Sequence, residues 1–173
     1  MTRRIGVLCP SCGAPLGGRD GCQSHFDALS AQAWGNPVRG AMHNLVVDAY
    51  ALQHPDEYCE SAKSYAAHLT GLCCGVEHPG DQKLYWQIAR WLDGPATIEK
   101  PAVVDARGRQ TISTIVNLSN DPYRTAVRQW ASSVWVAYES QQYLARTWLA
   151  EVLRHASRTS KESNSMGRIS ESD

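Results

Sequence analysis

Apolar residues recur at helical spacing along most of the chain, and this pattern predicts a mainly α-helical fold. Stripes of this kind predict one helix that begins at Phe26 and others over residues 38–54, 58–76 and 82–92. The turn between the helices over 38–54 and 58–76 is short. We therefore expect these two helices to pack as an antiparallel hairpin.

The longest helical pattern lies near the C-terminus. Asp121 followed by Pro122 is typical of a helix start, and the apolar stripe continues from there to about Arg154. This predicts one helix of roughly 30 residues, or about 45 Å. The pair Gln141–Gln142 interrupts the stripe, and amides near a packing face need hydrogen-bond partners. They could point into a polar pocket shared with hairpin histidines, or one of them could face solvent.

The pattern predicts a single domain over residues 1–155, formed by a bundle of about five helices, and the Cys-x-x-Cys spacing at residues 9–12 predicts an N-terminal zinc-knuckle loop. A hydrophobic content of 43% is enough to build a real core. The Gly and Pro residues within 93–110 predict an irregular connection, in which residues 102–104 could form a short strand. For residues 111–118 the pattern favours a helix. The Ser-rich segment 156–173 has few large apolar groups, so we expect it to be disordered.

Charge and hydropathy exclude several classes of partner. The chain carries 17 basic and 17 acidic side chains, so nucleic acid is a poor candidate partner. No run approaches about 20 apolar residues, which predicts no membrane span, and the apolar stretch at the N-terminus is too short for a secretion signal. We expect a cytoplasmic protein. In that reducing compartment a CxxC motif indicates a metal or redox site rather than a disulfide.

The stretch Cys9-Pro-Ser-Cys12-Gly13 carries the strongest chemical signal. CxxC spacing offers two thiolates from one tight turn, and Gly13 lets the backbone turn so that its N–H groups point at sulfur. With Cys22 as third ligand and His25 as fourth, the motif predicts a Zn²⁺ site, although the fourth ligand could also come from the helical bundle. A redox pair or simple buried thiols are the alternatives, but the strand–helix context of a thioredoxin-like motif is missing.

A second candidate site lies on the predicted hairpin. Asp48 lies in the middle of the helix over 38–54, and we expect His68 of the next helix to lie opposite it. His43 and His54 share a face of the first helix but lie about 16 Å apart, too far for one metal ion. Asp48, His54 and His68 are candidates for a catalytic site that binds a metal or transfers protons. The alternative is structural: a helix-capping His54, a core His68 and a loop-anchoring Asp48.

Several of these motifs together resemble a known family. They are Cys-Pro-x-Cys-Gly-Ala at 9–14, the string Asp-Ala-Tyr-x-Leu-Gln-His-Pro at 48–55, and the segments at 68–73 and 130–135. The chain resembles the bacterial family catalogued as domain of unknown function 5946, over about residues 7–153. This resemblance implies a shared architecture and promises no activity.

These observations predict a zinc-binding intracellular protein that acts as a non-catalytic interaction or regulatory module. The alternative is a metal-dependent enzyme with a His/Asp site in the helical bundle. The sequence lacks GxSxG, P-loop, GxGxxG and HExxH motifs, and their absence does not exclude an enzyme. We expect the partner of such a module to be a protein, and the Trp-rich last helix could form a homodimer.

Overall fold

The computed structural model describes residues 6–167, of which residues 159–167 are described by their backbone alone. Over this range the fold is helical, as predicted, and residues 102–104 form no strand. The α-helices are α1 (Gly18–Ala33), α2 (Pro37–Gln53), α3 (Pro55–Tyr58), α4 (Ala62–Glu77), α5 (Gln82–Asp93), α6 (Asn120–Ala137) and α7 (Gln142–Gly167). Two short 3-10 helices are η1 (Ile112–Thr114) and η2 (Glu139–Gln141).

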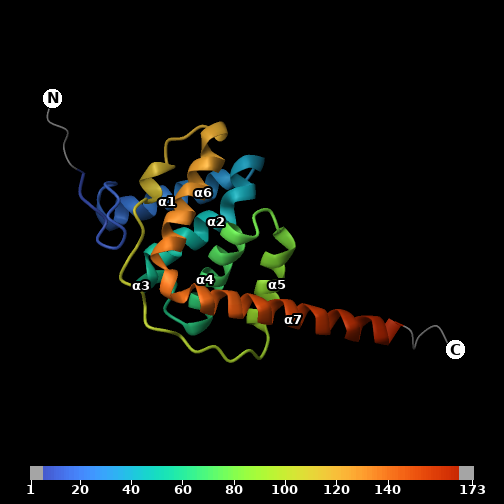
Figure 1. Ribbon diagram of the computed structural model, residues 1–173. Helices are drawn as coiled ribbons and strands as arrows, with labels where there is room; N and C mark the ends of the chain where they lie inside the picture. Colours follow the sequence, from blue (N-terminus) through green and yellow to red (C-terminus); the bar gives the residue numbers. More distant parts are fainter. Residues whose placement is uncertain (1–5, 168–173) are drawn as a thin grey trace.

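Helix α2 lies at the centre of the bundle. It packs against α1, α3, α4 and α6, and α4 in turn packs against α5, α6 and α7 (Figure 1). The contact between α2 and α4 agrees with the predicted hairpin. Every segment of the bundle is therefore in contact with α2 or with a neighbour of α2.

Local capping explains where the hairpin helices begin. The Asn36 side chain accepts hydrogen bonds from two backbone N–H groups at the start of α2, and Pro37 occupies the first helical position. Ser61 and Ser64 form a reciprocal capping box at the start of α4. Because this cap fixes the start, α4 begins at Ala62 and not at residue 58 as expected.

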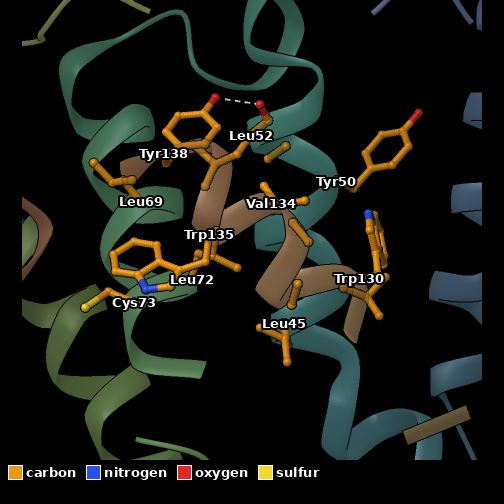
Figure 2. Packing of buried hydrophobic residues seen from close by; sticks show 14 of the residues in the cluster. Leu45, Tyr50, Leu52, Leu69, Leu72, Cys73, Trp130, Val134, Trp135 and Tyr138 are labelled. Carbon is orange, nitrogen blue, oxygen red and sulfur yellow. Dashed lines mark hydrogen bonds between the residues drawn. The ribbon is translucent and has the colours of Figure 1, made fainter. Parts of the chain in front are cut away.

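The core is formed where α6 crosses α2 and α4 (Figure 2). Trp130 and Val134 of α6, and Tyr138 directly after it, are fully buried against Leu52 and other apolar side chains. The Tyr138 hydroxyl donates a hydrogen bond of 2.6 Å to the backbone carbonyl of Leu52, drawn as a dashed line in Figure 2. This bond satisfies a carbonyl in the last turn of α2, where the helix itself supplies no partner.

The predicted long C-terminal helix is wrong, because the structure breaks it into α6 and α7. The chain turns through η2, and α7 leaves in a new direction and extends past the bundle (Figure 1). The change of direction lets α7 pack against α4 and α5. Helix α7 continues to Gly167, into the segment expected to be disordered, and residues 168–173 of that segment lie outside the described range.

The two amides at this break bind groups close to it. Gln141 is buried; it accepts a hydrogen bond from the Tyr65 hydroxyl and donates one to the Ala102 carbonyl. Gln142 donates to the Trp135 carbonyl at 3.0 Å. Neither amide joins a pocket with the hairpin histidines, so that interpretation of the pair is wrong.

A long connection between α5 and α6 runs around the outside of the bundle (Figure 1). The predicted helix over 111–118 is reduced there to the single turn η1. Gln53, the last residue of α2, attaches this connection to the core. Its amide donates to the backbone carbonyls of Arg107 and Gln110 and accepts a hydrogen bond of 3.0 Å from the Trp130 indole.

We predict that Gln53→Leu destabilises the fold by about 2–4 kcal/mol, because it leaves the buried indole N–H and two partly buried carbonyls without this partner. The measurement is the free energy of unfolding from urea denaturation. Gln129→Leu, at an exposed position of α6, is the matched control and should change stability by less than about 0.5 kcal/mol. Equal losses in the two variants would contradict this role of Gln53.

Candidate metal centre

The N-terminal loop folds back on itself around its two cysteines. The N–H of Gly13 donates to the Cys9 carbonyl at 2.8 Å, and the N–H of Cys9 donates to the Ala14 carbonyl at 2.9 Å. Gly13 has a φ of +78°, a conformation that residues with a Cβ rarely adopt. This turn brings the side chains of Cys9 and Cys12 to the same side of the loop, as the CxxCG motif predicts.

The third cysteine comes from helix α1. This helix begins at Gly18, eight residues before the start expected at Phe26, so Cys22 lies on its first turns and not in a loop. Gly17 and Gly18 both have positive φ, and their N–H groups donate to the Val7 carbonyl. These bonds hold the start of α1 against the N-terminal loop, and the Sγ atoms of Cys12 and Cys22 lie 3.7 Å apart.

The fourth member of the group is His54, at the C-terminal end of α2. Its Nε2 atom lies 3.4 Å from the Sγ of Cys9 and 3.6 Å from the Sγ of Cys22. The four donor atoms of Cys9, Cys12, Cys22 and His54 all lie within 4.8 Å of one another. All four residues are buried, with exposed fractions of 8% or less. The structure thus forms a closed Cys₃His group that could hold a metal ion.

Two interactions fix the orientation of the His54 ring. Its Nδ1 donates a hydrogen bond of 2.8 Å to the Tyr50 carbonyl, so the lone pair lies on Nε2, the atom that faces the sulfurs. The ring also stacks on Tyr50 at a centroid distance of 3.9 Å, and Tyr50 stacks on Phe26 at 4.0 Å. The imidazole is therefore held in the tautomer and orientation that a metal ligand needs.

The sulfur atoms form a strongly coupled group. The Cys12 thiol donates a hydrogen bond to Cys22, which lowers the pKa of Cys22 below its usual range. The same bond and burial raise the pKa of Cys12 above its usual range. Three sulfurs and the Nε2 atom of His54 lie around one point, so the group could hold a positive ion, which would replace the proton that Cys12 holds.

The predicted fourth ligand, His25, is not part of this group. It lies half-buried on α1, one residue before Phe26. Cys22 and Phe26 are four residues apart and share the buried face of α1, and Phe26 packs on Tyr50 beside His54. The fourth member of the group therefore comes from the bundle, the alternative that the sequence left open.

The residues of the second candidate site separate into different environments. His68 of α4 binds Asp48 of α2, with Nδ1 3.0 Å from the carboxylate. His54 belongs to the cysteine group instead. His43 is half-buried on α2 and belongs neither to the cysteine group nor to the Asp48–His68 pair. The structure therefore brings Asp48 and His68 together as expected but forms no single site from all four residues.

Sequence reasoning missed His54 as the partner of the cysteines because 32 residues separate it from Cys22. One signal was present. Tyr50 and His54 are four residues apart on one helix face, directly before Pro55, where a histidine can bond back to the carbonyl four residues earlier. That pattern identifies an oriented histidine but does not reveal which loop it faces.

Comparisons with known proteins identify a family and give no further relatives. Searches of curated proteins and of solved structures found no match. In the range that the structure describes, no helix has the length and apolar character needed to cross a membrane. Residues 7–139 match the profile described as "Family of unknown function (DUF5946)", and this match includes all four residues of the Cys₃His group. The chain therefore belongs to the DUF5946 family.

Proposed function

We propose that this protein is a zinc-binding, non-catalytic module, in which one zinc ion joins the N-terminal loop to the helical bundle. The observation that carries the proposal is the closed Cys₃His group. All four donors come from the protein and all four are buried, which is the arrangement of a structural zinc site. A catalytic zinc site keeps one position open for water or substrate.

The donor set and its spacing support zinc as the metal. Three thiolates and one imidazole are a common structural zinc set, and calcium or magnesium would require oxygen ligands. A tetrahedral zinc ion with the usual bond lengths separates two sulfurs by about 3.8 Å, and a sulfur from a nitrogen by about 3.6 Å. The pair Cys12–Cys22 lies at 3.7 Å, and His54 lies at 3.4 and 3.6 Å from its two sulfur neighbours.

The alternative of a metal-dependent enzyme finds less support. It needs histidines and Asp48 to converge on one accessible metal ion, but of the hairpin histidines only His68 binds Asp48, and His54 lies in the cysteine group. An interaction role agrees better with the surface, where Trp34 and Tyr143 expose more than 80% of their area. Exposed Trp and Tyr side chains are the residue types that contribute most to protein interfaces.

We predict that the purified protein carries about one zinc ion per chain and that His54→Ala abolishes it, because three thiolates without the imidazole leave the tetrahedral site incomplete. The measurement is elemental analysis after gel filtration. His25→Ala is the matched control and should retain the metal. Full zinc content in His54→Ala, or equal losses in the two variants, would contradict the proposed ligand set.

We further predict that a strong chelator loosens the N-terminal loop before the bundle. The loop contains few apolar side chains, so metal bonds supply much of the free energy that holds it. Hydrogen–deuterium exchange should rise in residues 7–22 much more than in α4, and added zinc should restore protection. Unchanged exchange in the loop after complete metal removal would show that the ion does not hold it.

A further inference from the structure

A groove with a cavity volume of about 380 Å³ lies between α2, α4 and α5. Its lining contains the Asp48–His68 pair, the amides of Asn44 and Gln82, and an apolar wall that includes Val47, Ile88, Leu92 and the exposed ring of Trp86. None of the four residues of the metal centre lines it. The volume falls in the range of small-molecule sites, and the mixture of apolar wall and few polar groups is typical of them.

The pair leaves one histidine nitrogen available to this groove. Nδ1 of His68 donates to the Asp48 carboxylate, so Nε2 carries the lone pair in the neutral ring. Among the described residues, Nε2 of His68 has no hydrogen-bond partner. The side chain retains 19% of its exposed area, so a molecule in the groove can reach this acceptor.

The fold makes specific room for Asp48. A Cβ atom at Gly71 of α4 would lie 2.2 Å from the carboxylate, so glycine there leaves Asp48 its position and a larger residue would displace the carboxylate. Glycine inside a helix costs about 1 kcal/mol relative to alanine. Burial also raises the pKa of Asp48 to about 6, and the hydrogen bond from His68 opposes that rise. A buried carboxylate kept at this cost beside a groove, and bonded to a neutral histidine, indicates a role other than stability.

The groups present exclude several kinds of chemistry. Among the described residues, groups of three or more metal-binding side chains occur only at the Cys₃His centre, so the pair is too small to hold a metal ion alone. The lining has no serine, cysteine or lysine that could act as a nucleophile. It also has no arginine or lysine to balance a phosphate or carboxylate, which Asp48 would repel.

We propose that this groove binds a small, flat, uncharged molecule that carries a hydroxyl group. The hydroxyl donates to Nε2 of His68, the flat body lies against the apolar wall and Trp86, and the amides of Asn44 and Gln82 bind further polar atoms. Asp48 is a positioning residue, because it holds the His68 tautomer that accepts this hydrogen bond. The proposal does not rest on the zinc site, which lies elsewhere on α2.

The test uses 4-fluorophenol as the probe and 4-fluoroanisole as its control, since the methyl ether lacks only the donor. Each is titrated into the full-length, metal-loaded protein and followed by ¹⁹F NMR. We expect saturable binding of the phenol, and weaker binding of the ether by roughly tenfold, the loss that one hydrogen bond to a buried acceptor produces. Equal affinity for the two probes, or no saturable binding of the phenol, would overturn the proposal.

Variants locate the binding. His68→Ala should weaken binding of the phenol by roughly tenfold. His43→Ala, on α2 outside the lining, should leave that affinity unchanged. Asp48→Asn should weaken binding of the phenol and shift the tautomer equilibrium of His68, which long-range ¹⁵N–¹H spectra report. A residue with a packing role alone would not change that equilibrium. Should His68→Ala fail to fold, as judged by zinc content and amide dispersion, His68→Gln replaces it. Phenol binding that survives loss of the imidazole in a folded variant refutes the site.

Discussion

The rest of the structure depends on the contacts that the C-terminal end of α2 makes. Three consecutive residues at this end bind three different parts of the chain. The Leu52 carbonyl accepts from Tyr138, which follows α6, the Gln53 amide holds the outer connection, and His54 faces the cysteines. Pro55 then prevents the helix from continuing. The Leu52 carbonyl can accept its bond because a carbonyl at a helix end lacks a partner within the helix, whereas Gln53 and His54 bind through their side chains.

This arrangement couples the candidate metal centre to the core. The His54 ring is held through the Tyr50 carbonyl and through stacking on Tyr50, so its position follows that of α2. The N-terminal loop and the start of α1 contribute three sulfurs but little apolar surface. The bundle therefore supplies a pre-organised ligand, and a metal bound there would attach a weakly packed segment to a strongly packed one.

The helical architecture and the cysteine half of the centre follow from local sequence. Apolar stripes and caps act over a few residues, and CxxCG spacing fixes its own turn. Proximity along the chain favoured His25 as the fourth member, whereas the structure places His54 of the bundle beside the three sulfurs. The break between α6 and α7 could not be predicted either. It depends on Gln141 binding Tyr65 and Ala102, residues that are distant in sequence and adjacent only after folding.

His54 and His68 show how the surroundings of a hydrogen-bonded histidine determine what its free nitrogen can bind. In each, Nδ1–H donates a hydrogen bond to a fixed acceptor, which is the Tyr50 carbonyl for His54 and the Asp48 carboxylate for His68. The lone pair of each ring therefore lies on Nε2 and has a fixed direction. Around His54 three sulfurs close the space, which suits an ion that stays bound. Around His68 a groove remains open, so the same lone pair faces molecules that can enter and leave. The difference lies in the neighbours of the imidazole and not in the imidazole itself.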